Sequence, residues 1–307
     1  MYELIIKHQT NKGVSLLTMK SYETTWNRFV DWFQKQSADT DPWHATQRDL
    51  ADFKRYLLKH GGRNQKPAAA STMQLTFTHL KAIFDVFKRE GIVPDNPVDD
   101  ISKPKKARRT PKWLSRNEQN QLMRTVRAHG DLKELAIFAC FLNVGFRVHE
   151  LCELLIEDIQ ITDRKGSVYI RGKGDKDREV PLNVDVRNVI QRYLKERAEQ
   201  HQRKGEIDDS KYLFTSQRSK GYTTRGMQFI VEKYRSKTNI KHLSCHALRH
   251  TFGHELVTAD SPVRLEVVAR LMGHFKENGD PNLDMTLIYT TAGVEELENA
   301  VEGITWS

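Results

Sequence analysis

Apolar residues recur at helical spacing along the first third of the chain. Three stripes of this kind occupy residues 22–33, 50–57 and 80–87, and they are rich in aromatic side chains. Because residues three and four apart share one face of an α-helix, each stripe predicts an amphipathic helix. Ser71 is the expected N-cap of the third helix, and Gly91 marks its expected end. Aromatic side chains at this spacing are core residues far more often than base-stacking ones, so we predict a packed helical domain.

A short basic segment separates this helical region from the rest. Residues 103–112 (KPKKARRTPK) contain six basic residues and two prolines, a composition that disfavours regular structure. The sequence therefore predicts a helical domain over residues 1–102, a linker over residues 103–112 and a second domain over residues 113–307. The linker is expected to lie along a phosphate backbone through Lys103, Lys105, Lys106, Arg108 and Arg109.

The second domain is also predicted to be mainly helical. Ser115 and Glu118 have the spacing of a capping box, and residues 133–144 are largely apolar, as expected of a buried helix. Gly145 interrupts this pattern. The later apolar patterns predict an amphipathic stripe from Val148, helices at residues 186–200 and 224–236, and a short strand at residues 212–214.

Residues 166–182 (GSVYIRGKGDKDREVPL) have a different character. Val168 and Ile170 alternate with polar residues, a turn-like segment follows, and the alternation resumes at Val180. Alternation on both sides of a glycine-containing turn predicts a β-hairpin, here with a basic tip. The predicted fold class is therefore mainly α, with two domains and a small antiparallel β-sheet in the second.

Composition limits the class of protein and its location. The chain has 307 residues, of which 38% are hydrophobic and 29% charged, as in a globular protein of two domains. No apolar run reaches the length of a membrane span, and the N-terminus lacks a signal-peptide pattern. Cys140, Cys152 and Cys245 are scattered and are expected to be reduced thiols. We therefore expect a cytoplasmic protein with no membrane partner.

Basic charge is concentrated in the first third. The net charge is +9; residues 1–112 carry 20 Lys and Arg against 12 Asp and Glu, and the remainder carries 29 against 28. Because each phosphate that a protein neutralises releases condensed counterions, an anionic polymer is the expected partner. Ribosomal, RNA-binding and membrane-surface proteins can be equally basic, so charge alone does not identify the polymer.

Four motifs in the second domain carry candidate chemistry. In chain order they are GFRVHELCEL, RGKGDKDREVPL, HALRHTFGHEL, and LMGH followed by IYT. The ordered set resembles the active-site pattern of the tyrosine recombinases, the family of phage integrases and Xer-like enzymes. The residues that fill the pattern are Arg147, Lys173, His246, Arg249, His274 and Tyr289. The resemblance covers residues 113–295, and it implies that residues 1–102 form a SAM-like core DNA-binding domain.

The arginines and the tyrosine also fit phosphodiester transfer on physical grounds. Transfer between oxygens builds negative charge on the non-bridging oxygens, and a planar guanidinium can grip two such oxygens at once. Arg147 and Arg249 are expected to stabilise the transition state in this way. The resemblance implies that Tyr289 is the nucleophile of a 3′-phosphotyrosyl intermediate, with no cofactor, metal ion or ATP.

Proton transfer requires further groups. A phenol has a pKa of about 10, so Tyr289 needs a base or a positive environment. His246 is the candidate base, and His274 is a candidate hydrogen-bond donor to the phosphate. The leaving 5′ oxygen needs a proton, which Lys173 is expected to supply as general acid. Lys176 lies in the same hairpin, where it could exchange roles with Lys173, and it is also an expected DNA contact.

The resemblance also implies partners. The expected substrate is a double-stranded DNA core site with inverted repeats, held in a synapse by a homotetramer in the prokaryotic nucleoid. Residues 275–288 are longer than the family's usual spacer, which leaves open whether Tyr289 acts in its own active site or in a neighbour's. The apolar pattern of residues 293–301 predicts a short amphipathic helix. The resemblance implies that this helix docks on an adjacent subunit. The N-terminus leaves little room for a separate arm-binding domain, which favours an Xer-like or transposon-resolution role.

Three alternatives remain open from the residues. A type IB topoisomerase uses a similar set of Tyr, Arg, Lys and His. A metal-dependent enzyme could use His246, His250 and His254, which are spaced to share one helix face. A DNA-binding protein that has lost catalysis is the third. Tyr222 and Tyr234 are other tyrosines in this region, but neither follows a Gly-His motif.

Overall fold

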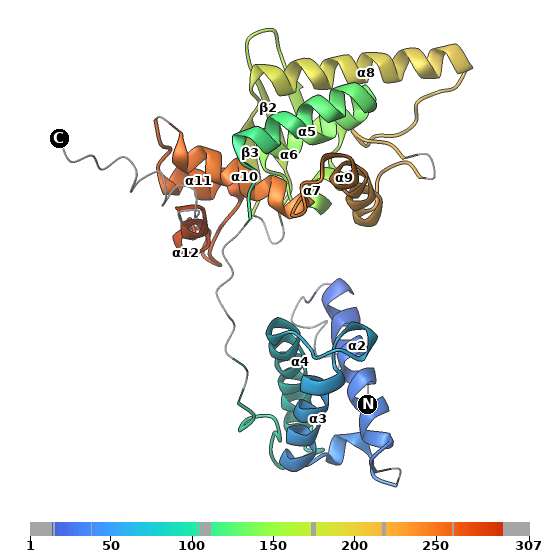
Figure 1. Ribbon diagram of the computed structural model, residues 1–307, viewed down its shortest axis with the longest axis vertical. Helices are drawn as coiled ribbons and strands as arrows, with labels where there is room; N and C mark the ends of the chain where they lie inside the picture. The colour runs from blue at the N-terminus through green and yellow to red at the C-terminus, as the bar shows by residue number, and fades with distance from the viewer. Residues whose placement is uncertain are drawn as a thin grey trace, which may run out of the picture. The chain divides into compact units, whose positions relative to one another are not determined.

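The chain divides into two compact units, Met1–Arg109 and Thr110–Ser307 (Figure 1). The computed structural model describes residues 14, 16–37, 39–102, 104, 112–172, 176–216, 219–259 and 261–290. Most of the predicted linker lies outside the described residues. Within those ranges, no helix has both the length and the apolar content that a membrane crossing requires.

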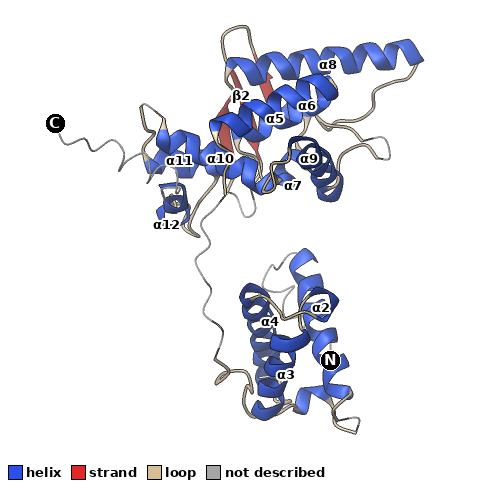
Figure 2. Cartoon of the chain, in the orientation of Figure 1, coloured by secondary structure: helices blue, strands red, loops and turns tan. Residues whose placement is uncertain are grey.

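Among the described residues of the first unit, three α-helices form its core, as the sequence pattern predicted. Its elements are α2 Leu16–Gln34, η1 Pro42–His44, α3 Gln47–His60, η2 Arg63–Gln65 and α4 Ala70–Arg89 (Figure 2). All three apolar stripes face one core, in which the ring centroids of Phe29 and Phe53 lie 5.2 Å apart. Thr46 caps α3 through a reciprocal capping box with Asp49, and α4 ends just before Gly91.

The start of α4 differs from the prediction. The N-cap position is occupied by Ala69, whose side chain cannot accept a hydrogen bond, and the helix begins at Ala70. The Ala68 amide donates to the carbonyl of Leu57 at 3.0 Å, which fixes the extended approach to the helix. Ser71 therefore lies inside the first turn, and its prediction as the N-cap was wrong.

The second unit is mostly helical. Its helices are α5 Arg116–His129, α6 Leu132–Val144, α7 Val148–Glu153, η3 Ile156–Asp158, α8 Val184–Lys204, α9 Thr224–Thr238, α10 Cys245–Thr258, α11 Leu265–Met272, α12 Leu283–Thr286 and η4 Leu287–Thr290. The largely apolar α6 packs against both α8 and α10, which confirms it as a central buried helix. Ser115 caps α5 in the predicted capping box with Glu118. The stripe from Val148 forms only the short α7.

A small antiparallel sheet stands beside these helices. Its strands are β1 Ile159–Ile161, β2 Gly166–Ile170 and β3 Arg178–Pro181, in the order β1-β2-β3. Val168 pairs with Val180, and both are buried. The predicted hairpin is confirmed. The short β1 was not predicted.

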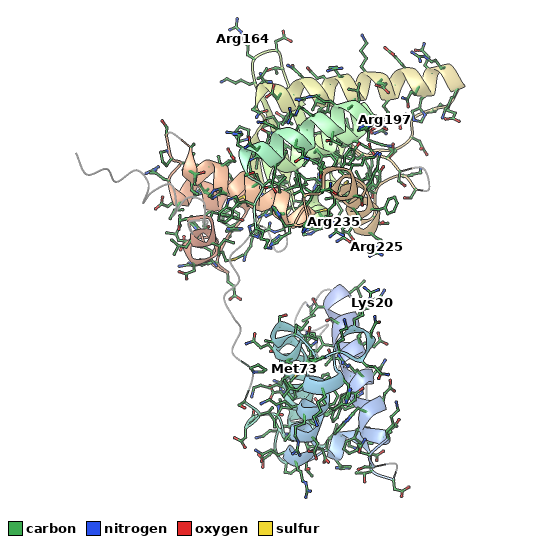
Figure 3. The ribbon with its side chains drawn as sticks, in the orientation of Figure 1. Lys20, Met73, Arg164, Arg197, Arg225 and Arg235 are labelled. Atoms are coloured by element: carbon green, nitrogen blue, oxygen red, sulfur yellow. The ribbon has the colours of Figure 1, made fainter. Side chains whose placement is uncertain are left out.

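The strand predicted at residues 212–214 does not form. Tyr212 makes a single bridge to Leu155, and the segment has no place in the three-stranded sheet. Arg197 of α8, labelled in Figure 3, donates from Nη1 to the carbonyls of Tyr212 and Leu213 at 2.7 and 2.9 Å. Because a side chain occupies these acceptors, the apolar pattern there reflects burial rather than a β-ladder.

Candidate active site

A tight turn between α6 and α7 positions Arg147. α6 ends at Gly145, whose φ of 70° lies in the left-handed region that favours glycine. A Cβ atom at this position would collide with the ring of Phe252 on α10. Gly145 therefore allows α6 to approach α10 and turns the chain, so that Arg147 occupies the N-cap of α7 with 33% of its side chain exposed.

Three arginines surround the buried carboxylate of Glu150 in the first turn of α7. Arg178 donates to both carboxylate oxygens at 2.9 Å, and Arg147 Nη1 donates to one of them at 2.8 Å. Arg249 Nη1 lies 3.8 Å away. Burial raises the pKa of Glu150, but the hydrogen bonds and charges of Arg178 and Arg147 outweigh burial and hold the pKa at about 2. The carboxylate is thus ionised and orients the guanidinium groups.

Arg249 on α10 is 4% exposed and donates to backbone carbonyls. Its Nη1 donates to Gly145 O at 2.5 Å, and its Nη2 donates to the carbonyl of Met272. Arg147 Nη2 donates to the next carbonyl, that of Gly273, at 2.9 Å. The end of α11 therefore holds both arginines side by side. Burial and the nearby Arg147 lower the pKa of Arg249 to about 10, which leaves it charged at neutral pH.

Glu150 and Arg178 are site residues that the sequence analysis missed. Arg178 shares the inward face of β3 with Val180, and its Nε donates to the carbonyl of Leu271 at 2.9 Å. The available signal was an arginine at an inward position of an alternating strand, because a buried charge requires a partner. The second signal was the position of Glu150, three residues after Arg147 at the start of a helix, which is the spacing of a capping box.

His246 and His250 lie one turn apart on α10, with ring centroids 4.0 Å apart. His246 is exposed, whereas His250 is 7% exposed. Within the described part of the chain, no hydrogen-bond partner reaches Nδ1 of His250. Burial and the charge of Arg249 lower the pKa of His246. Burial, followed by His246 and Arg249, lowers the pKa of His250 to about 4. Both imidazoles are therefore neutral at neutral pH.

His274 follows the left-handed Gly273, which has a φ of 63°, and it is 4% exposed. Its Nδ1 lies 3.1 Å from Thr286 Oγ1, and its Nε2 lies 3.4 Å from Arg249 Nη2. Burial, with the charges of Arg249 and Arg147, lowers the pKa of His274 to about 3. His274 is thus a neutral, buried imidazole in direct contact with a guanidinium.

Tyr289 is buried against these histidines, with 1% of the residue exposed. Its ring is nearly parallel to that of His274, at an angle of 12° and a centroid distance of 5.8 Å. Gly253 on α10 makes room for it, since a Cβ there would lie 2.8 Å from the tyrosine ring. Burial raises the pKa of Tyr289, and the charges of Arg249 and Arg147 act in the opposite direction.

The structure brings most of the predicted catalytic residues into one site. Those that meet are Arg147, His246, Arg249, His274 and Tyr289. The predicted residues that lie outside the described part of the chain are Lys103, Lys105, Lys106, Arg108, Arg109 and Lys173.

Lys176 is described, and it is half-buried just before β3. Beside it, the amide of Gly172 donates to Asp177 Oδ1 at 2.7 Å.

The long spacer before Tyr289 folds back on itself. Phe275 bridges to Pro281, and the Lys276 amide donates to Asp280 O at 2.8 Å. The turn returns the chain to His274, whose carbonyl accepts from the Asn282 amide at 2.7 Å. α12 and η4 then carry the chain to Tyr289. The helix predicted at residues 293–301 lies outside the described residues.

The geometry does not support the alternative metal site. His254 Nδ1 lies 3.3 Å from the carbonyl oxygen of Tyr289, and its ring stacks on Trp113 at a centroid distance of 4.0 Å. This ring is therefore engaged by the tyrosine segment and by the residues that follow the linker. Among the described residues, no group of three His, Cys, Asp or Glu side chains is placed to hold a metal ion.

Two family models match the chain. The phage integrase SAM-like domain matches residues 1–106, and the phage integrase family matches residues 112–295. The chain belongs to the phage integrase family. This membership confirms the predicted enzyme class, a tyrosine-type site-specific recombinase, and it does not favour the topoisomerase alternative.

Relatives of this phage integrase family member include Xer recombinases. The tyrosine recombinase XerC of Treponema denticola is 28% identical over 295 residues, which cover 92% of this chain and 90% of that protein. The tyrosine recombinase XerA of Thermococcus kodakarensis is also 28% identical, over 95% of this chain and 90% of that protein.

Solved structures share the fold of this phage integrase family member. The XerH recombinase bound to difH substrate in a pre-cleavage complex has a TM-score of 0.70 at 20% identity, covering 98% of this chain and 84% of that chain. The Tn1549 transposon integrase in complex with transposon right end DNA has a TM-score of 0.66 at 20% identity, covering 98% of each chain. The predicted fold class, a SAM-like helical domain followed by a mostly helical domain with a small antiparallel sheet, is confirmed.

Proposed function

We propose that this recombinase cleaves duplex DNA by attack of the Tyr289 hydroxyl on a phosphodiester. The observation that carries the proposal is the buried position of Tyr289 against His274, whose Nε2 lies 3.4 Å from Arg249 Nη2, in a site where Arg147 lies beside Arg249. This arrangement brings the tyrosine together with the two cations that a transferring phosphate requires. The new bond joins the tyrosine oxygen to phosphorus, and the bond from phosphorus to the 5′ oxygen breaks. Because one ester replaces another, rejoining needs no ATP.

The two arginines are the proposed phosphate ligands. A guanidinium carries five N–H donors, so the carbonyl and carboxylate contacts of Arg147 and Arg249 leave donors for non-bridging oxygens. Glu150 and the carbonyls at the end of α11 fix the two planes before substrate arrives. A fixed pair of donors stabilises developing charge without the cost of reorganisation during the reaction.

Two further groups are proposed to move protons. His246 has a lowered pKa, so its neutral form is available to accept the Tyr289 proton. Lys173 is the proposed donor to the leaving 5′ oxygen. In the sequence it follows Gly172, whose amide donates to Asp177 Oδ1 at 2.7 Å. Both assignments rest on the match of these residues to the family motifs.

The proposed substrate is a duplex core site with inverted repeats, synapsed by a homotetramer in the nucleoid. Support comes from the XerH and Tn1549 integrase structures, which hold difH substrate and transposon end DNA. The exposed basic side chain of Arg225 on α9 suits a phosphate backbone (Figure 3). The segment 293–301 is the proposed contact between subunits. Binding should weaken steeply with salt, and a flat salt response would contradict a substrate held through many phosphates.

The test uses a pool of nicked duplexes with randomised inverted half-sites around the nick. A short fragment that diffuses away after cleavage prevents rejoining, so a covalent adduct accumulates. We expect a slowly migrating protein–DNA band on denaturing gels. Peptide mapping should place the DNA on Tyr289, and sequencing of the trapped duplexes should identify the core site.

Tyr289→Phe should bind the same duplexes without forming the adduct. Tyr222→Phe, which alters a tyrosine outside this site, is the matched control and should form the adduct at the wild-type rate. An adduct in the Tyr289→Phe protein, or mapped to another tyrosine, would overturn the assignment. Cleavage in the presence of EDTA is expected to be undiminished.

A further inference from the structure

Trp113 and Leu114, which follow the predicted linker, are fastened to the second unit through their backbone groups. The Leu114 amide donates to Thr251 Oγ1 of α10 at 2.9 Å, and its carbonyl accepts from Gln119 Nε2 at 3.0 Å. The carbonyl of Trp113 accepts from His242 Nε2 at 3.0 Å, and the side chain of Leu114 is buried. The segment that leaves the linker is therefore held in one place against α10.

His254, one turn after Thr251 on α10, connects this segment to Tyr289. The residue is 7% exposed, and its ring stacks on the indole of Trp113 with ring centroids 4.0 Å apart and ring planes at 22°. Its Nδ1 lies 3.3 Å from the carbonyl oxygen of Tyr289. Since a carbonyl oxygen can only accept, Nδ1 carries a proton and donates the hydrogen bond, whether the ring is neutral or charged. One side chain thus contacts both the segment after the linker and the backbone of the tyrosine.

The backbone of Tyr289 depends on partners outside its own helix. The residue lies in η4 Leu287–Thr290, and the last carbonyl groups of a helix have no hydrogen-bond donor within it. Gly253, the residue before His254, lies against the ring of the same tyrosine. Two consecutive residues of α10 therefore contact the ring and the backbone of Tyr289, and both contacts determine where its hydroxyl lies.

We propose that Trp113 and His254 are positioning residues that hold the backbone of Tyr289, so that docking of the segment after the linker on α10 is coupled to the placement of the tyrosine. The terminal torsion of a histidine side chain is broad, so its ring needs a neighbour to fix its plane. The stacked indole is that neighbour, and it keeps Nδ1 directed at the Tyr289 carbonyl. The catalytic consequence rests on the proposed function, whereas the contact itself does not.

Three substitutions separate the stacked rings from the hydrogen bond. Trp113→Leu removes the aromatic face, so the plane of the His254 ring is no longer fixed. His254→Phe keeps a flat ring against Trp113 but removes the donor to Tyr289. Trp113→Phe keeps an aromatic face and is the conservative control. If the two residues only filled space, His254→Phe would be among the mildest changes because it keeps both rings, whereas the proposal places it among the most damaging.

The first measurement is an NMR spectrum of the DNA-free protein that correlates ¹³C-labelled tyrosine carbonyl groups with ¹⁵N-labelled threonine amides. Only Tyr–Thr peptide bonds give a signal, and the sequence has this pair only at residues 222–223 and 289–290. We expect the Tyr289 signal to move in Trp113→Leu and in His254→Phe and to stay near its wild-type position in Trp113→Phe. The Tyr222 signal, which Tyr222→Phe removes and so identifies, is the internal reference.

A Tyr289 signal that does not move in Trp113→Leu would overturn the coupling, and one that does not move in His254→Phe would overturn the hydrogen bond. If a variant does not fold, the wild type still tests the contact through a long-range ¹H–¹⁵N spectrum of its histidines. An unprotonated Nδ1 at His254 would contradict the proposal, because the Tyr289 carbonyl would then have no donor in that ring.

The second measurement is the rate of adduct formation on the nicked duplex pool at saturating protein, together with the affinity for the duplex. Because a misplacement of about 1 Å can lower a rate by about 100-fold, we expect Trp113→Leu and His254→Phe to lose about 10- to 100-fold in rate with unchanged affinity. Trp113→Phe should react at nearly the wild-type rate. Since both residues act through one contact, the double variant should lose no more than His254→Phe alone.

A loss confined to affinity, or a wild-type rate in Trp113→Leu, would overturn the positioning role. Absence of adduct in the wild-type protein would instead refute the proposed function, while the Tyr289 carbonyl signal would still test the contact in the DNA-free protein.

Discussion

The arginine side and the histidine–tyrosine side of the candidate site are stabilised in opposite ways. On the arginine side, Arg147, Arg178 and Arg249 share the ionised Glu150 and donate to backbone carbonyls. On the other side, the rings of the histidines and Tyr289 pack against one another with few hydrogen bonds. Permanent charge is thus held by a polar network, and the neutral groups are held by packing.

This contrast assigns different tasks to the two sides. Burial lowers the pKa values of His250 and His274 to about 4 and about 3, and the charges of the guanidinium groups that Glu150 fixes act in the same direction. The arginine network therefore has two proposed effects: it presents positive charge to a phosphate, and it helps burial to keep the adjacent imidazoles unprotonated. A change to the network should disturb both sides, whereas a change to the rings should disturb mainly one.

The largest effect is expected from Glu150→Gln. The substitution keeps the shape of the side chain but leaves buried guanidinium groups without their counter-charge. Breaking a buried ion pair from one side typically lowers stability by about 3–5 kcal/mol, and we expect a loss of that size in the free energy of unfolding, measured with denaturant at pH 7.

Glu153→Gln, at an exposed position of the same helix, is the control and should change stability by less than about 0.5 kcal/mol. The pH dependence sharpens the test. The pKa of Glu150 is lowered from 4.5 to about 2, so its contribution is complete above pH 4.5 and is lost as the pH falls toward 2. The difference in unfolding free energy between wild type and Glu150→Gln should therefore become smaller as the pH falls from 4.5 toward 2. A difference that does not change with pH would contradict an ionised Glu150 at the centre of the arginine network.

The next largest effect is expected at Gly145, which lies where the two sides meet. An alanine would strain the left-handed backbone by about 1–2 kcal/mol, and its Cβ would also collide with Phe252. We expect Gly145→Ala to lower the free energy of unfolding by about 2–4 kcal/mol in total. Gly205→Ala is the matched control, because Gly205 has a similar φ of 66° but open space around its Cβ position. Equal losses in the two variants would show that the approach of α6 to α10 is not tight.

The sequence predicted the side chains that meet at the candidate site better than the network that holds them. Arg147, Arg249 and Tyr289 could be identified because they fill motifs that resemble those of the tyrosine recombinases, and because these residue types suit phosphodiester transfer. The helical stripes and the hairpin followed from periodicity. These features depend on local sequence or on the chemistry of single residues, and both can be read without a structure.

Contacts between distant segments could not be read in the same way. Glu150 and Arg178 meet from α7 and β3, and Thr286 meets His274 only after the spacer folds back. The strand predicted at residues 212–214 failed for a related reason, because Arg197 from α8 takes its carbonyl groups. Each of these depends on a hydrogen-bond partner whose position the local pattern does not specify.

A smaller effect is expected from acid on the histidine side. The pKa of His274 is lowered from 6.5 to about 3, so below pH 6.5 the unfolded chain binds a proton that the folded protein does not. Stability therefore falls as the pH falls from 6.5 toward 3. We expect the difference in unfolding free energy between wild type and His274→Gln to shrink by about 1 kcal/mol from pH 7 to pH 5.5. His149→Gln, at an exposed position of α7, is the control, and a pH-independent difference for His274→Gln would contradict a neutral imidazole.

The smallest effect on stability is expected from Tyr289→Phe, although it abolishes the proposed reaction. Arg249 keeps its carbonyl acceptors when the hydroxyl is removed, so the loss should stay below about 1 kcal/mol. Tyr234→Phe provides the comparison, because the Tyr234 hydroxyl donates to Glu134 Oε2 at 2.6 Å, and a hydrogen bond to a charged group contributes about 1.5–3 kcal/mol. Denaturant unfolding of the two variants compares directly how much each hydroxyl contributes to the free energy of unfolding. If Tyr289→Phe is the more destabilised, the hydroxyl of the proposed nucleophile belongs to the supporting network, and the separation between a charged framework and neutral rings does not hold.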